Sequence, residues 1–394
     1  MNASAEALQA EQPPLNRSGL LLGICTVVFL AAIVSLVLAL SGDGIDYPSF
    51  AASWLYLMGI TQAGVVFTAI MRLVGADWSK PYHRVAELST LAFFPIAAGG
   101  LFVVGYFGRD ELFYWLHPGE HAHMSSWLDY NWLIVRNCTG MLLFYSMSAY
   151  YVVKAMQPDL ESLSDDQLEH REQRLEVLGT LVIVTFVIAN TFVAWDFGMM
   201  LIEHWHSTVF PIFFSFGNLF AGTAALIMLP VVFGRTETRG SPFGLKQIRS
   251  LGMVVTGFTL MWLYFFWAQF FVTWFGNLPH ESAPLWKQMY GHYAPYFWTM
   301  MAACFFVPFV AFIFAFVKRS LLAMFIVAAG INSGIWLNKY LTVATTFSEN
   351  DRPFDSWLDI LLALGMLAGF LAVLLLLMRR FPVYARWEMA RRVD

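Results

Sequence analysis

Four ionisable residues interrupt an otherwise apolar stretch of the chain. The segment WDFGMMLIEHWHSTVFP, at residues 195–211, contains Asp196, Glu203, His204 and His206. Carboxylate and imidazole groups exchange protons, and imidazole does so near neutral pH. If the flanking apolar runs cross a membrane, a carboxylate buried between them is unfavourable unless it has a partner or lines a hydrated cavity. The segment therefore indicates proton or hydrogen-bond chemistry, provided that the helices bring a partner to Asp196.

Arg136 is the candidate partner. It lies six residues into the span that is expected to start near Tyr130, about 9 Å from that end at 1.5 Å per residue. Asp196 lies seven residues before Glu203, about 10 Å from the same end. Two interpretations follow: a buried ion pair that only fixes helix packing, or a polar pocket or proton relay.

Three further polar residues lie in apolar runs of the second half of the chain. Lys339 occurs in IWLNKYLTV, and Tyr264 and Gln269 lie in an earlier run. Together with Glu203, His204 and His206 they could form a proton path. Alternatively, Tyr264 and Gln269 make ordinary interhelical hydrogen bonds, and Lys339 snorkels to the membrane surface. For Lys339 the sequence favours snorkelling.

Seven of the nine histidines lie in connections that we expect on one side of the membrane: His117, His121, His123, His204, His206, His280 and His292. None lies in the middle of an apolar run, where a b-type haem would need its axial ligands, so we expect no bound haem. The pairs His121-x-His123 and His204-x-His206 could form a metal site. We expect no metal, because no cysteine or clear carboxylate pattern accompanies them. These histidines instead predict a polar outer surface where protons enter or leave.

The composition indicates a membrane protein. Of 394 residues, 58% are hydrophobic and only 13% are charged, against about 25% charged in soluble proteins. The mean hydropathy is +0.60. The net charge of −4 gives no reason to expect nucleic acid as a partner. The three cysteines lie far apart in apolar runs, so cysteine-based iron–sulfur and zinc motifs are excluded.

The pattern predicts an all-α integral membrane protein. Ten apolar segments are long enough to span a bilayer, near residues 19–41, 50–74, 86–108, 130–156, 176–202, 206–233, 247–276, 293–317, 320–347 and 357–380. The first run is too long for the core of a cleaved signal peptide, so we expect a retained first span. Of 23 lysines and arginines, 18 fall in connections on the side of the N-terminus and four on the opposite side. This bias predicts that both termini are cytoplasmic.

A weak internal repeat suggests how the spans are grouped. The segment GITQAGVVFTAIM from Gly59 matches GNLFAGTAALIML from Gly217 in the spacing of its small residues. The match predicts two parallel four-helix bundles, spans 2–5 and 6–9, with two peripheral spans. The expected divisions are a cytoplasmic tail (1–18), the first span and outer loop (19–48), two bundles (49–205 and 206–347), and the tenth span with a basic cytoplasmic tail (348–394). Generic packing of small residues is the alternative.

Three segments carry a resemblance to a known family. WDFGMMLIEHWHSTVFPIFFSFGNLFAG resembles the NrfD/PsrC family of quinone-interacting membrane subunits, and GFTLMWLYFFWAQFFVTWFGNLPHE is similar to the ActF subunit of bacterial alternative complex III. LFYWLHPGEHAHMSSWLDYNWLIVRNCTGMLLFYSMSAYY fits the same pattern of outer loop, apolar helix and early arginine.

The resemblance implies a subunit of a quinol-oxidising electron-transfer complex in the bacterial inner membrane, with proton release or translocation. Its partners would be the lipid bilayer, a sister NrfD-like subunit, and periplasmic iron–sulfur and multihaem cytochrome c subunits. Ubiquinol or menaquinol would be the bound cofactor, with Arg136, Asp196 and His123 as candidate contacts. Such a chain is part of an oxidoreductase rather than an enzyme alone. Three alternatives stay open: a quinone-reactive anchor of a molybdoenzyme-type reductase, a purely structural anchor, and a secondary transporter.

Overall fold

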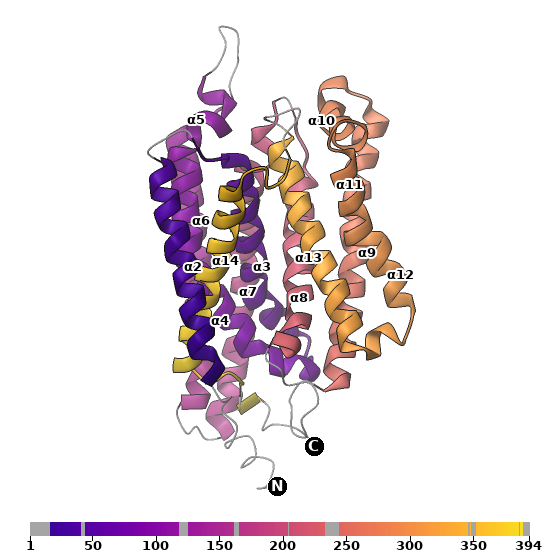
Figure 1. Ribbon diagram of the computed structural model, residues 1–394. Coiled ribbons are helices and arrows are strands. Elements are labelled where there is room, and N and C mark those ends of the chain that lie inside the picture. Colours follow the sequence, from indigo (N-terminus) through magenta and orange to yellow (C-terminus); the bar gives the residue numbers. More distant parts are fainter. Residues whose placement is uncertain are drawn as a thin grey trace.

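The computed structural model describes residues 16–40, 44–117, 125–160, 165–203, 205–232, 244–345, 347, 352–385 and 387–388, and in this part the chain is helical without strands (Figure 1). The long helices are α2 (Asn16–Leu40), α3 (Tyr47–Leu73), α4 (Lys80–Phe102), α6 (Tyr130–Leu160), α7 (Asp165–Asp196), α8 (Phe210–Val232), α9 (Leu245–Gly276), α13 (Leu321–Ala344) and α14 (Trp357–Arg380). A further crossing is built from α11 (Ala294–Met301), a π-helical turn (Ala302–Phe306) and α12 (Val307–Ile313). The shorter elements are α5 (Arg109–Leu112), α10 (Pro279–Tyr290), a π-helical turn (Val103–Phe107) and four 3₁₀ turns (Asp77–Ser79, Tyr114–Leu116, Met199–Leu201, Val317–Arg319).

These helices confirm an all-helical membrane protein with about ten spans. Within the described residues, nine helical segments are long and apolar enough to cross a membrane. The remaining predicted span corresponds to α6, which has 31 residues. This helix is less apolar because Arg136 and Asn137 and several hydroxyl side chains lie along it.

The long helices run side by side, so the bundle has two ends (Figure 1). We call the end at which α2 begins and α14 finishes the near end, and the opposite end, which carries α5 and α10, the far end. The positive charges of the connections predict that the near end faces the cytoplasm.

The spans form two groups. In the first group α3 packs against α4 and α7, and α6 packs against α4 and α7. In the second group α8 packs against α9 and α13, and the α11–α12 crossing contacts both α9 and α13. The first and last spans, α2 and α14, pack against each other, and α14 also covers α3 and α4.

Small residues hold the two groups together at the interface of α3 and α8. A Cβ atom on Gly222 would lie 2.4 Å from the Cβ atom of Ala63, and one on Gly59 would lie 2.3 Å from the side chain of Asn218. These residues belong to the two segments that match each other in the sequence. Their small side chains allow the two backbones to approach closely, as in other membrane helix pairs.

Candidate functional site

The carboxylate of Asp196 is the centre of a buried polar cluster at the far end. Asp196 is the last residue of α7 and is fully buried. Arg136 of α6 donates from Nε to Oδ2 at 2.7 Å and from Nη2 to Oδ1 at 2.5 Å. Nδ2 of Asn137 donates to Oδ2 at 2.5 Å, and Nε1 of Trp127 donates to Oδ1 at 3.1 Å. The predicted pairing of Arg136 with Asp196 is confirmed.

The segment that precedes α6 folds back over this ion pair. Nη1 of Arg136 donates to the carbonyl oxygen of Trp127 at 3.0 Å, and the guanidinium carbon lies 4.2 Å from the centre of the indole ring. Tyr130 fixes the same segment, because its hydroxyl donates to the carbonyl oxygen of Gly105 at 2.9 Å. The indole therefore covers a charge pair that is already hydrogen-bonded at both carboxylate oxygens.

This geometry suits a structural brace between α6 and α7. Both oxygens of Asp196 already accept two hydrogen bonds each, which fills the lone-pair sites of a carboxylate. A quinol or a transferred proton would have to displace one of these donors. A functional role of Asp196 and Arg136 stays a prediction.

Two other residues predicted near this end, Glu203 and His206, do not join the buried cluster. Glu203 and His206 are exposed in the connection between α7 and α8. His123 and His204 lie outside the described residues. The helix α7 ends earlier than the expected span 176–202, because it stops at Asp196 and a 3₁₀ turn (Met199–Leu201) follows.

Lys339 is buried in the second helix group, and no acidic side chain of the described residues pairs with it. Its side chain is 1% exposed, and its Nζ atom lies 3.0 Å from the centre of the Phe214 ring. Among the described residues no hydrogen-bond partner for this nitrogen is found. The expectation that Lys339 snorkels to the surface is wrong, because the helix rotation directs the amine toward α8 rather than toward water. Tyr264 is 60% exposed, so it does not join Lys339 in one internal path.

Gln269 lines a small cavity of about 60 Å³ between α9, α10 and α13. Its Oε1 atom is buried and has no hydrogen-bond partner within the described part of the chain. Asn338, the neighbour of Lys339 in sequence, lines the same cavity. The predicted residues of the second half are thus separated into an exposed Tyr264, a buried Lys339 and a cavity at Gln269.

Three amides that the sequence analysis did not single out connect the helix groups near their middle. Nδ2 of Asn190 donates to Oε1 of Gln62 at 3.0 Å, and Nδ2 of Asn218 donates to Oδ1 of Asn190 at 2.7 Å. This chain of hydrogen bonds crosses from α3 through α7 to α8. The sequence could have indicated these contacts, because amide side chains inside apolar spans often form hydrogen bonds between helices.

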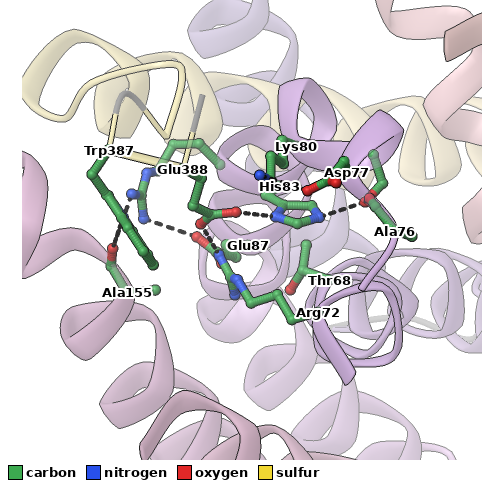
Figure 2. A network of polar contacts seen from close by, with 12 residues as sticks. Thr68, Arg72, Ala76, Asp77, Lys80, His83, Glu87, Ala155, Trp387 and Glu388 are labelled. Atoms are coloured by element: carbon green, nitrogen blue, oxygen red, sulfur yellow. Dashed lines mark hydrogen bonds and ion pairs between the residues drawn. The ribbon is translucent and has the colours of Figure 1, made fainter. Parts of the chain in front are cut away.

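A larger buried charge network lies at the near end (Figure 2). Nη2 of Arg72 lies 2.6 Å from Oε1 of Glu87 and 2.6 Å from Oε1 of Glu388. Oε2 of Glu388 lies 2.6 Å from Nδ1 of His83. Glu87 also pairs with Arg84, with 2.9 Å between Oε2 and Nη1. Glu87 and Arg72 were usable signals, because they fall inside the predicted spans 86–108 and 50–74, whereas Arg84 falls in the connection between those spans.

The network ties the segment after α14 to three helices. Nη2 of Arg84 lies 2.6 Å from Oδ2 of Asp159 in α6. The other oxygen of Asp159 accepts from the backbone N–H of Trp387 at 3.1 Å, and Nε1 of Trp387 donates to the carbonyl oxygen of Ala155 at 3.0 Å. Burial by itself would raise the pKa of Glu388, but the charges of Arg72 and His83 outweigh burial and hold that pKa well below its usual range.

The structure describes one of the four histidines of the candidate metal site, His206. Among the described residues no group of three His, Cys, Asp or Glu side chains is placed to hold a metal ion. Three of the four histidines in question, His121, His123 and His204, lie outside that part of the chain.

Two comparisons find known proteins whose sequences are similar to this chain. The family model described as "Polysulphide reductase, NrfD" matches residues 45–346, a range that runs from the start of α3 to the end of α13 and leaves α2 and α14 outside. The C subunit of the selenate reductase of Mesobacillus selenatarsenatis is 23% identical over 305 residues, which is 70% of this chain and 70% of that protein.

Proposed function

Because the family model matches most of the chain, the protein belongs to the NrfD family, and we propose that it is the quinone-reactive membrane subunit of a reductase complex. In this proposal the chain anchors a redox partner at the far end and exchanges electrons between that partner and the membrane quinone pool. The observation that carries the proposal is the family match across both helix groups. The similarity to a selenate reductase's C subunit favours the molybdoenzyme-type anchor over the alternative complex III-like subunit.

The placement of the internal polar groups supports this proposal. The Asp196 cluster and the cavity at Gln269 both lie toward the far end, which the basic residues predict to be periplasmic. An iron–sulfur or molybdenum-containing partner on that side would receive or deliver electrons a short distance from these groups. Proton release to the same side, a sister NrfD-like subunit and a cytochrome c partner are finer proposals that the ActF resemblance implies.

Co-purification tests the proposal directly. A tagged chain is solubilised from native membranes, and the accompanying chains are identified by mass spectrometry. We expect a partner with iron–sulfur or molybdenum-cofactor content. Recovery of multihaem cytochrome c would instead favour the complex III-like alternative, and a chain that purifies alone and moves a solute would favour the transporter.

Turnover measurements separate a quinone-reactive subunit from a structural anchor. The complex is driven by decylubiquinol or menadiol in one assay and by reduced methyl viologen, which feeds the redox partner directly, in another. In membranes that lack this chain, we expect dye-driven turnover to survive and quinol-driven turnover to disappear. Quinol-driven turnover that persists without the chain contradicts the proposal.

A further inference from the structure

The cavity in the second helix group, which we call the slot, is lined largely by aromatic rings. Its lining includes residues of α10, which lies at the far end of the molecule (Figure 1). α9 and α13 lie diagonally across this group, because each packs against α8 and against the α11–α12 crossing. Five aromatic side chains contribute to the lining: Trp205, Phe210, Phe213, Phe266 and Phe270. Aromatic walls of this kind favour a flat, apolar ring over a charged or branched ligand.

Two amide side chains on these diagonal helices line the slot with unused hydrogen-bonding capacity. Oε1 of Gln269, on α9, is buried and has no partner among the described residues. Nδ2 of Asn338, on α13, donates to the sulfur of Met300 at 3.4 Å, and a thioether is a weak acceptor. A buried acceptor without a donor is unfavourable, so the slot is suited to a ligand that supplies one.

No lining residue of the slot is charged. A free anion or cation would therefore be bound without a counter-charge, which is unfavourable in a low-dielectric interior. A neutral planar ring with one oxygen at each of two opposite edges fits better. One edge donates a hydroxyl hydrogen to Gln269, and the other accepts from the amide of Asn338.

We propose that this slot binds the headgroup of a membrane quinol or quinone, at a site distinct from the Asp196 cluster. The inference rests on the proposed function, and it adds the location of the quinone site and the residues that contact the headgroup. The cavity of about 60 Å³ has room for roughly four to six water molecules. The headgroup therefore enters fully only when the flexible side chain of Met300 moves aside, a motion that an unbranched thioether permits.

Two leucine substitutions test the contacts in the complex purified from native membranes. Gln269→Leu and Asn338→Leu each remove one hydrogen bond, and we expect each to raise the KM for decylubiquinol or menadiol by about tenfold. Turnover driven by reduced methyl viologen should not change. Thr299→Val is the matched control, because Thr299 is an exposed residue of α11 whose hydroxyl donates only to its own helix.

The outcomes separate this inference from the proposed function. Unchanged KM values in both leucine variants, in a complex that oxidises quinol, overturn the inference and leave the proposed function standing. Failure of the unaltered complex to react with either quinol contradicts the proposed function instead. If the variants do not assemble, photolabelling of the unaltered complex with an aryl-azide quinone decides the question. Label on α9 and α13 supports the inference, and label confined to other helices overturns it.

Discussion

Two buried ionisable side chains at the far end differ in how they are compensated. Asp196 accepts hydrogen bonds from Arg136, Asn137 and Trp127. Lys339 instead faces the ring of Phe214 and has no hydrogen-bond partner within the described residues. Burying a charge is costly unless it is paired, so substitutions at the two positions should change stability in opposite directions.

Removing one partner of the ion pair should destabilise the protein more than removing both partners. We expect Asp196→Asn or Arg136→Gln to lower the free energy of unfolding by about 3–5 kcal/mol, because the remaining charge is left buried and uncompensated. The double variant should lose less. Thermal unfolding of the purified chain in detergent measures the three effects, and quinol-driven turnover of the assembled complex measures function.

The double variant also separates the two roles considered for the pair. Full assembly with full turnover assigns Arg136 and Asp196 to helix packing alone. Full assembly with impaired quinol turnover assigns them to the chemistry. A double variant that is less stable than either single variant would show that the two side chains do not act as a pair.

Replacing Lys339 by an apolar side chain of similar length should stabilise the protein. Lys339→Met removes an amine that is buried without a hydrogen-bond partner among the described residues, and we expect a gain of about 1–3 kcal/mol. Lys246→Met is the control, because Lys246 is an exposed residue of α9 and its replacement should have little effect. A Lys339→Met variant that melts at a lower temperature would show that the contact with Phe214 outweighs the cost of burial.

At the scale of elements, the sequence was a good guide to the spans. The predicted segments near 50–74, 130–156 and 357–380 correspond to Tyr47–Leu73, Tyr130–Leu160 and Trp357–Arg380. Apolar length alone decides such segments. The end of α7 at Asp196 was not predicted, because the residues that follow it, at positions 197–202, are apolar apart from Gly198 and continue the pattern of a span.

The candidate site was predictable only where depth along a helix decides a contact. The number of residues from the end of each span placed Arg136 and Asp196 at the same depth in the membrane, and the structure shows that they form an ion pair. Rotation about the helix axis decided the direction of Lys339, and the sequence pattern does not fix it. The contribution of Trp127 depends on the path of a loop, and that of Glu388 on the return of the chain after α14, so neither followed from local patterns.

Close packing of α3 on α8 predicts a sharp difference between two helical glycines. A methyl group on Gly222 would lie 2.4 Å from the Cβ atom of Ala63 and 2.9 Å from the carbonyl oxygen of Ile60. We expect Gly222→Ala to destabilise the protein by about 1–3 kcal/mol through overpacking. A methyl group on Gly257 of α9 would meet no described atom within 4 Å, so Gly257→Ala should be neutral or stabilising by up to about 1 kcal/mol. Equal melting temperatures of the two variants would contradict this interface.

The near-end network makes the stability of the whole molecule depend on pH. The pKa of Glu388 is lowered in the folded protein by Arg72 and His83, so the unfolded chain binds more protons in acid. The stabilisation is therefore complete above the ordinary glutamate pKa of about 4.3. It is lost as the pH falls from that value through the lowered folded value.

Substitution of Glu388 should reduce this acid dependence. We expect Glu388→Gln to cost about 1.5–3 kcal/mol at neutral pH, the range for hydrogen bonds to charged groups. Its melting temperature should then fall less between pH 6 and about pH 3 than that of the unaltered chain, because the titrating carboxylate is gone. Glu169→Gln, at an exposed position of α7, is the control and should keep the original profile. A Glu388→Gln variant with an unchanged profile would mean that other carboxylates dominate acid unfolding.

The orientation of the molecule in the membrane follows from the difference between its two ends. The near end carries Arg72, Arg84 and both arginines that close α14, and positive charges are retained in the cytoplasm during insertion. An alkaline phosphatase reporter placed between residues 117 and 125, at the far end, should be active, and the same reporter fused after residue 394 should be inactive. A fluorescent-protein fusion at residue 394 is the complementary control, because it should fluoresce only in the cytoplasm. An active phosphatase after residue 394, with no fluorescence there, would reverse the orientation and place the Asp196 cluster and the Gln269 slot at the cytoplasmic side.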